Sequence, residues 1–271
     1  MRKIIKIISY LRYLPAIIFK IRNWPVFLLN YAHLRNTAAE YIFRNGIRIK
    51  TSDSISATTI AVIFIKRDYG DIPNNSVIID VGANIGAFSI FSSGKSNIVY
   101  SYEPMPDNFR LLEENIKLNK LENRVFAFNL GVAAKREKRK LYLGKSPFHS
   151  FLPVGSSPFN VLHNDREGVS KQSFLEVDCI SLKDIFDENQ ISECDILKID
   201  CEGAEYEILY NLPDIYFKRI KEIRMEYHNH LNQYKNNGEY LKSFLINRGF
   251  SVEKLKKGSP YQGDVWFKKV D

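Results

Sequence analysis

The ten residues VIIDVGANIG, from position 77 to 86, restrict the fold of this chain more than any other stretch. They begin with a branched apolar run that has no polar residue before Asp80. Such a run is typical of a strand that is buried on both faces of a parallel sheet. Gly82 and Gly86 follow directly. Because glycine adopts backbone angles that other residues avoid, a ligand can lie against the main chain there.

The chain after residue 50 alternates between segments of strand and helix character. A helix or strand is expected within 54–72, and helices at 83–93, from Pro104 onward, at 204–212 and at 239–249. Strands are expected at 98–103, 124–133, 195–200 and 220–227, with a charged turn running into a strand at 135–144. Segments 251–257 and 264–270 would pair as a terminal hairpin. This order predicts an α/β doubly wound sheet, in which ligands bind at the carboxyl ends of the strands.

The glycine loop lacks the motifs that bind phosphates. Its spacing is GxxxG, so the GxGxxG dinucleotide pattern is missing, and the chain has no GxxxxGK[ST] loop. Glu103 ends the next expected strand, where its carboxylate can accept hydrogen bonds from two ribose hydroxyls. Asp80 is expected near an amino group of the ligand or near its ordered water. A phosphate-free nucleoside with a positive tail describes S-adenosylmethionine.

Three blocks of the sequence resemble the FkbM-type methyltransferases. They are IIDVGANIGAFSI, YEPMPDNFRLLEENIKLN and ILKIDCEGAEYEIL, and the resemblance extends in order over residues 69–250. The most specific block is Lys198-x-Asp200-x-Glu202-Gly203-x-Glu205. The resemblance implies a class I methyltransferase (Rossmann-like) fold with a seven-stranded mixed sheet. It also implies S-adenosylmethionine-dependent O-methylation of a sugar, glycan, polyketide or related secondary metabolite.

The expected cofactor contacts follow from the loop, the strand ends and the resemblance. Asn129 ends an expected strand and could meet the adenine edge, although asparagine also makes ordinary turns. Tyr69 stands where the family often carries a tyrosine near the cofactor, and packing on the core is the alternative. The full cofactor-binding set is Tyr69, Asp80, Gly82, Asn84, Gly86, Glu103 and Asn129.

The candidates for catalysis are Asp200, Glu202, Lys198 and His228. Lys198 and Asp200 point the same way along their strand, and Asp200 would end beside the glycine loop. Asp200 is the first candidate for a general base, with Glu202 in support, and such a base contributes about 10²–10⁴-fold. A structural ion pair at the strand end is the alternative. His228 is the second candidate base, and a solvated or capping histidine is the alternative.

Two further interpretations concern a metal and the substrate loop. Asp200, Glu202 and Glu226 could converge on a divalent cation such as Mg²⁺, but nothing in their spacing demands one, so no metal is assigned. Residues 145–175 are rich in Ser, Pro and Gly, as in many substrate loops. His149 in this segment is a weaker catalytic candidate.

The N-terminal segment differs in charge from the rest of the chain. Residues 1–50 carry ten Lys and Arg but only one acid, Glu40, whereas the remainder is almost neutral. We therefore divide the chain into a basic amphipathic helical arm at 1–50 and a methyltransferase domain at 51–271. Residues 1–35 either lie peripherally on an anionic membrane or pack on the domain. Charged residues and prolines interrupt the arm too often for a membrane-spanning helix, and no small-residue cleavage site follows an apolar core, so a secretory signal is not expected either.

The cysteines and the charge bear on location and on competing functions. Cys179, Cys194 and Cys201 form no CxxC pair, which favours a reducing, cytoplasmic compartment and buried thiols. A nicotinamide-dependent oxidoreductase shares the strand–glycine–acid order but would carry GxGxxG. Nucleic-acid methylation ranks low because the body is near neutral and the fourth strand is followed by Asp-Cys-Glu-Gly instead of an aromatic platform. A non-catalytic membrane-surface module with this fold is the remaining alternative.

Overall fold

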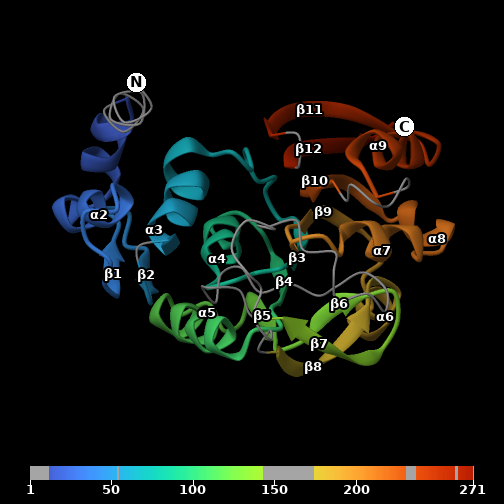
Figure 1. Ribbon diagram of the computed structural model, residues 1–271, viewed down its shortest axis with the longest axis horizontal. Helices are drawn as coiled ribbons and strands as arrows, with labels where there is room; N and C mark the ends of the chain where they lie inside the picture. Colours follow the sequence, from blue (N-terminus) through green and yellow to red (C-terminus); the bar gives the residue numbers. More distant parts are fainter. Residues whose placement is uncertain (1–11, 54, 143–173, 230–235, 260–261, 271) are drawn as a thin grey trace, which may run out of the picture.

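The computed structural model describes residues 12–53, 55–142, 174–229, 236–259 and 262–270 (Figure 1). Its central element is a seven-stranded sheet with the order β11-β12-β10-β9-β3-β4-β5. The strands are β3 (Val77–Val81), β4 (Ile98–Tyr102), β5 (Val125–Phe128), β9 (Cys194–Ile199), β10 (Ile220–His228), β11 (Phe250–Ser259) and β12 (Gln262–Lys269). The expected seven-stranded mixed sheet is confirmed.

The strand order reverses at β3. The chain continues from β3 through β4 to β5 on one side, all parallel, and later adds β9 and β10 in parallel on the other side. The hairpin of β11 and β12 then pairs antiparallel to β10. The carboxyl ends of β4, β3 and β9 therefore meet at the switch point, which is where such sheets bind ligands.

Helices cover both faces of the sheet. Alternate residues of one strand serve the two layers, because Ile78 belongs to one buried cluster and Ile79 to the other. Figure 1 shows α3, α4 and α5 on one side of the central strands and α7, α8 and α9 on the other. The helices that follow β3 in the chain are α4 (Ala87–Ser93), α5 (Pro106–Leu118), α6 (Leu182–Glu188), α7 (Glu205–Tyr210), α8 (Asp214–Phe217) and α9 (Gly238–Ile246).

The expected single strand at 124–133 was wrong. The chain leaves the main sheet after β5, and residues 131–133 form β6 in a second, three-stranded sheet. The Asn129 side chain lies at the break and donates to the carbonyls of Glu103 (2.8 Å) and Pro104 (3.1 Å), which ties the chain to the end of β4. The small sheet has the order β6-β8-β7, with β6 (Gly131–Ala133), β7 (Glu137–Tyr142) and β8 (Phe174–Ser181).

The N-terminal part contains more than the two helices expected from the sequence. Helical residues 12–20 precede α2 (Trp24–Tyr31), the hairpin β1 (Ala39–Ile42) and β2 (Arg48–Thr51), then α3 (Ile55–Ile60) and the π-helix η1 (Ala61–Lys66). Ile17, Phe27 and Ile49 are fully buried and share a cluster with Ile78 of the central sheet. Asn115 of α5 accepts from the Lys50 main chain at 2.7 Å.

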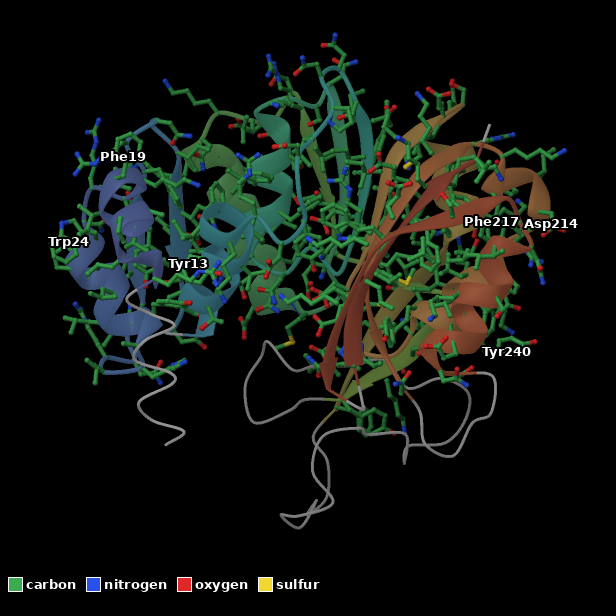
Figure 2. All side chains as sticks on the ribbon, turned by 90° about the horizontal axis from the view of Figure 1, so that it is seen from above. Tyr13, Phe19, Trp24, Asp214, Phe217 and Tyr240 are labelled. Carbon is green, nitrogen blue, oxygen red and sulfur yellow. The ribbon has the colours of Figure 1, made fainter. Side chains whose placement is uncertain are left out.

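The outer end of this N-terminal part exposes apolar side chains. Phe19 is 79% exposed, and with Trp24 it lies at the end of the molecule opposite Asp214 and Tyr240 (Figure 2). Among the helices that the structure describes, none has the length and apolarity needed to cross a bilayer. The boundary near residue 50 and the peripheral membrane contact of residues 1–35 stay predictions.

Candidate functional site

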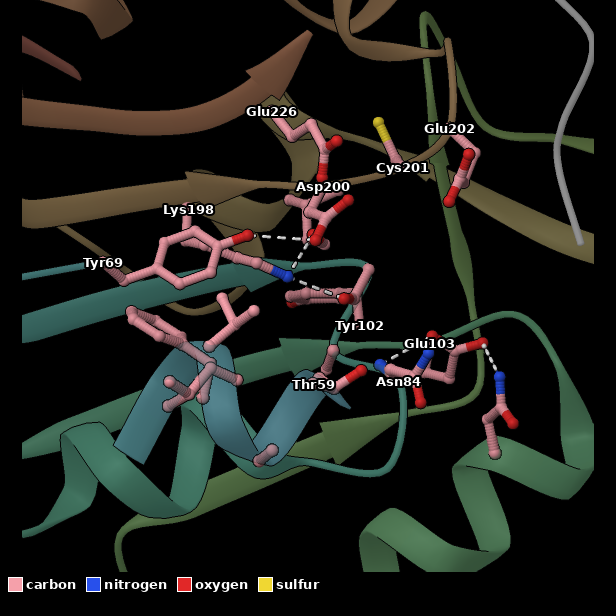
Figure 3. Close-up of a pocket in the computed structure, with 18 of the residues that line it drawn as sticks. Thr59, Tyr69, Asn84, Tyr102, Glu103, Lys198, Asp200, Cys201, Glu202 and Glu226 are labelled. Carbon is pink, nitrogen blue, oxygen red and sulfur yellow. Dashed lines mark hydrogen bonds between the residues drawn. The ribbon is translucent and has the colours of Figure 1, made fainter. Parts of the chain in front are cut away.

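A cavity of about 390 Å³ lies at the carboxyl ends of β3, β4, β9 and β10. Figure 3 shows Asp200, Glu202 and Glu226 toward one end of it and Glu103 with Asn84 toward the other. Residues of η1 and of β12 complete the wall, among them Lys66 and Asp264. The cavity size is within the range of ordinary small-molecule pockets.

The loop after β3 is shaped by the approach of two strand ends. Gly82 has a φ of +74°, and a Cβ atom built on it would lie 1.9 Å from the carbonyl oxygen of Asp200. Only glycine therefore lets β9 pass so close to the end of β3. Gly86, with a φ of +84°, faces Leu112 of α5 instead, and its Cβ would lie 2.4 Å from a methyl carbon. Gly82 lines the cavity, whereas Gly86 serves the packing of α4 on α5.

The Glu103 carboxylate is fixed by the chain on both sides of it. One oxygen accepts from the main-chain N–H of Asn84 at 2.8 Å, and the other from that of Met105 at 2.9 Å. The side chain of Asn108 is 3.5 Å from the same oxygen as Met105. Burial raises the pKa of Glu103 to about 7 in spite of these donors. The group is oriented, lines the cavity and can accept further hydrogen bonds at its remaining lone pairs.

Lys198 and Asp80 form a buried ion pair behind the loop. The Lys198 Nζ lies 3.0 Å from an Asp80 oxygen and donates to the carbonyl of Gly82 at 2.7 Å. The other Asp80 oxygen accepts from the Ser89 hydroxyl at 2.6 Å. Burial disfavours the ammonium, but Asp80 and Asp200 together outweigh burial and raise the pKa of Lys198. Asp80 is fully buried outside the residues that line the cavity, so it holds Lys198, which in turn holds the loop.

Asp200 lies at the centre of the cavity wall, just beyond β9. Its main-chain N–H donates to Val81 at 3.1 Å, which continues the pairing of β9 with β3. The Tyr69 hydroxyl donates to its carboxylate at 3.0 Å. Burial, reinforced by the Asp200 charge, raises the pKa of Tyr69 well above its ordinary value, so this phenol stays a donor.

His228 lies behind the cavity and is not among the residues that line it. Its Nδ1 is 3.2 Å from Glu205, and its Nε2 is 3.5 Å from Glu202 and 4.0 Å from Glu226. Burial opposes the imidazolium, but Glu205 and the other two carboxylates raise the pKa of His228 to about 10. A ring that is already protonated at neutral pH cannot act as the general base suggested by the sequence.

Two glutamates of the cavity lining, Glu202 and Glu226, have pKa values near neutral. Burial raises the pKa of Glu202 to about 7 and that of Glu226 to about 8, with Asp200 adding to both. Burial also raises the pKa of Asp264. Glu226 accepts from the Gln262 side chain of β12 at 2.7 Å. Glu202 and Glu226 can therefore exchange protons near physiological pH.

The structure brings together most of the residues singled out in the sequence. The cavity is lined by Tyr69, Gly82, Asn84, Glu103, Lys198, Asp200 and Glu202, whereas Asp80, Gly86, Asn129 and His228 lie outside its lining. Sequence reasoning missed Thr58, Thr59, Lys66, Asp68, Lys256 and Asp264, and it considered Glu226 only as a metal ligand. The last two acids sit on strands that pair, since Glu226 is opposite Asp264 in the β10–β12 register.

Within the described part of the chain, no group of three or more His, Cys, Asp and Glu side chains is arranged to hold a metal ion. A convergence of Asp200, Glu202 and Glu226 on a divalent cation is therefore not supported there. His149 and almost all of the expected substrate loop lie outside the described residues.

Comparison with known proteins gives the family. The Methyltransferase FkbM domain model matches residues 80–252. Methyltransferase 1 of Beauveria bassiana is 27% identical over 206 residues, which is 70% of this chain and 79% of that protein. The 31-O-demethyl-FK506 methyltransferase FkbM of Streptomyces tacrolimicus is 25% identical over 56% of this chain and 65% of its own. The hexuronic acid methyltransferase AglP of Haloferax volcanii is 26% identical over 50% of this chain and 49% of its own.

A solved structure agrees with the fold. The crystal structure of Methyltransferase FkbM from Methylobacillus flagellatus superposes with a TM-score of 0.50 and 14% identity. The match covers 77% of this chain but 47% of that one, so the present chain spans about half of the solved protein. The class I, Rossmann-like architecture is thereby confirmed.

Proposed function

This chain belongs to the FkbM methyltransferase family, and from that membership we propose that it transfers a methyl group from S-adenosylmethionine to a hydroxyl oxygen. We place the acceptor among sugars, glycans and related secondary metabolites. The observation that carries the proposal is that Glu103 and Asp200, from the two strands that flank β3, line one cavity. The nucleoside would then bind at the Glu103 end of the cavity and the acceptor at the Asp200 end, both at the switch point of the sheet.

The residues present fit a phosphate-free, positively charged nucleoside. Glu103 is a buried carboxyl whose oxygens are aimed by two main-chain donors, which suits two neighbouring ribose hydroxyls. Asp200, Glu202 and Glu226 give the other end an acidic wall, which favours a sulfonium over a phosphate. When bound, S-adenosylmethionine supplies a methyl group activated by that sulfonium.

The chain's own contribution to the reaction is alignment and proton acceptance. Methyl transfer is an in-line displacement, so holding the acceptor oxygen against the methyl carbon supplies much of the acceleration. Lys198 fixes Gly82 of the loop and thereby one side of the cavity. Asp200, oriented by Tyr69, is placed to position the acceptor hydroxyl. A sugar hydroxyl is a weak nucleophile, so a neighbouring carboxylate is needed to take its proton.

The names of the relatives support a hydroxyl acceptor. The name of one relative gives a hexuronic acid as its acceptor, and that of another gives 31-O-demethyl-FK506. A hexuronic acid carries hydroxyl groups, and the term 31-O-demethyl denotes an oxygen that lacks its methyl group. The cavity lining also contains Thr58, Thr59 and Asp68, whose side chains can form hydrogen bonds with hydroxyl groups of an acceptor.

Isothermal titration of the full chain with S-adenosylmethionine tests the proposal directly. We expect saturable one-site binding, a weakening of at least tenfold in Glu103→Gln, and no change in Glu122→Gln, an exposed acid beyond α5. Transfer of labelled methyl to a panel of sugars and macrolides would then identify the acceptor class. Absence of binding in the folded wild type, or fluorescence quenching by reduced nicotinamide cofactor instead, would overturn the proposal.

A further inference from the structure

Glu202 and Glu226 flank one buried imidazole at the acidic end of the cavity. Glu202 occupies the turn between β9 and α7, with a φ of 54°, and Glu226 lies on β10. The Nε2 of His228 is 3.5 Å from a Glu202 oxygen and 4.0 Å from a Glu226 oxygen. Their side chains are 29% and 26% exposed, compared with 5% for His228. The carboxylates therefore face the cavity while the imidazole lies behind them.

The imidazole is held from the rear by Glu205, the first residue of α7. Glu205 is fully buried, and one of its oxygens accepts from the His228 main chain at 2.5 Å and lies 3.2 Å from its Nδ1. Its other oxygen accepts from the Gly203 main chain at 2.8 Å. The ring position is thus fixed by two separate contacts with one carboxylate. Both ring nitrogens face carboxylates, which an imidazolium satisfies with two N–H donors.

Acidic side chains outnumber the single imidazole at this end of the cavity. The groups that face the imidazole or its two front carboxylates are Asp200 after β9, Glu202, Glu205 on α7, Glu226 on β10 and Asp264 on β12. The negative charge is greater than one imidazolium can offset. Consistent with this, the pKa of Glu205 is lowered by His228 although burial opposes it, while Glu202 and Glu226 stay raised to about 7 and 8.

We propose that Glu226, with Glu202 beside it, accepts the proton of the acceptor hydroxyl, and that His228 is a positioning residue that keeps this pair ionisable. The inference rests on the proposed function. In the step, the acceptor oxygen forms a bond to the methyl carbon, the sulfur–carbon bond breaks with its electron pair going to sulfur, and the hydroxyl proton passes to a carboxylate oxygen.

Glu226 suits this role better than Asp200 because of what each carboxylate already binds. One Asp200 oxygen already accepts a hydrogen bond from the Tyr69 phenol at 3.0 Å. Glu226 accepts from the side-chain amide of Gln262 at 2.7 Å, and it also lies 4.0 Å from the His228 imidazole. A base with a pKa near the working pH combines availability and strength. The partly exposed side chain can pass the proton on to solvent.

Two experiments on the full chain separate this inference from the proposed function. The first measures carboxyl titration by ¹³C NMR of protein labelled at the glutamate side-chain carbons, and it needs no acceptor. In His228→Gln we expect the Glu226 midpoint to rise by about one pH unit, because a neighbouring positive charge is lost. In Glu202→Gln we expect it to fall, because a like charge is removed. If His228 had only a packing role, His228→Gln would lower the melting temperature and leave the Glu226 titration midpoint unchanged.

The second experiment measures methyl transfer to an acceptor identified in the panel. Glu226→Gln should lose about 10²–10⁴-fold in kcat, a far larger factor than its loss of affinity for S-adenosylmethionine. Glu253→Gln, an exposed acid on β11, serves as the control and should keep wild-type kcat. Glu226→Gln leaves both contacts between Glu205 and His228 in place, so it remains informative if His228→Gln fails to fold. Wild-type kcat in Glu226→Gln would overturn the inference even where cofactor binding is intact.

Discussion

The Tyr69 hydroxyl donates a 3.0 Å hydrogen bond to the Asp200 carboxylate, 131 positions later in the chain. Tyr69 reaches the cavity from the segment that precedes β3, and Asp200 from the end of β9. The Tyr69 ring also lies 5.9 Å from the Nζ of Lys198. This contact therefore joins the N-terminal wall of the cavity to the strand end that carries its central acid.

Tyr69→Phe should remove this hydrogen bond and leave the aromatic ring in the cavity wall. A hydrogen bond to a charged group contributes about 1.5–3 kcal/mol, so we expect a comparable loss in the free energy of unfolding, measured in urea. Methyl transfer should slow as well, because Asp200 loses the group that orients it. Tyr100→Phe, on β4 outside the cavity, is the matched control. Equal stability of the two variants would show that the bond contributes nothing.

Gly82→Ala should be much more damaging than the same change at Gly46. Both glycines have positive φ angles, +74° and +95°, and alanine there costs about 1–2 kcal/mol. Only at Gly82 would the new Cβ meet main chain, at 1.9 Å from Asp200, whereas nothing lies within 4 Å at Gly46. Urea unfolding should show the larger loss for Gly82→Ala, with S-adenosylmethionine binding lost as well. Similar losses at both sites would mean that the strand ends separate easily.

Breaking the Lys198–Asp80 pair should destabilise the protein by about 3–5 kcal/mol, because one buried charge is left without its partner. We therefore expect Lys198→Met and Asp80→Asn each to lower the urea midpoint strongly. The double variant should lose less than the two single losses added together, since it leaves no lone charge. Additive losses in this double-mutant cycle would show that the two residues do not stabilise each other.

The sequence was sufficient for the main sheet because its strands are short apolar runs bounded by strong turn signals. The run at 77–80 and the block around Asp200 predicted neighbouring strands, and both end at the cavity. The break at Asn129 was missed because the apolar pattern continues to residue 133, while the turn depends on two side-chain hydrogen bonds to the distant end of β4. Such contacts have no local signature.

Side-chain roles were harder to predict than positions. Asp80 looked like a ligand contact, but its partner Lys198 comes from a strand that is adjacent only after folding. His228 looked like a base, and only the three surrounding glutamates reveal it as a cation. Lys256 and Asp264 enter the cavity from the terminal hairpin, where their polar pattern resembled ordinary surface. Each role depends on charges brought together from separate elements.

Cofactor affinity should depend on pH through Glu103. Burial raises its pKa to about 7 from an ordinary 4.5, so in the free protein the neutral form dominates below neutrality. By linkage, this group's contribution to folding is largest at acid pH and declines as the pH rises from about 4.5 to 7. The pH dependence of cofactor binding has the opposite sign, because a carboxylate that accepts hydrogen bonds from two ribose hydroxyls must be ionised. We therefore expect affinity for S-adenosylmethionine to be constant above about pH 8 and to fall up to about tenfold per pH unit below 7.

Calorimetric titrations between pH 5.5 and 8.5 would measure this dependence. Glu103→Gln should bind weakly with a flat pH profile, since its amide does not titrate. Glu122→Gln should reproduce the wild-type curve, because that exposed carboxyl lies outside the cavity. Proton release on binding, read from buffers of different ionisation enthalpy, should rise from near zero at alkaline pH toward about one proton per ligand below pH 7, and it should be smaller in Glu103→Gln. A wild-type affinity that is independent of pH would show that Glu103 is not the group that binds the ribose hydroxyls.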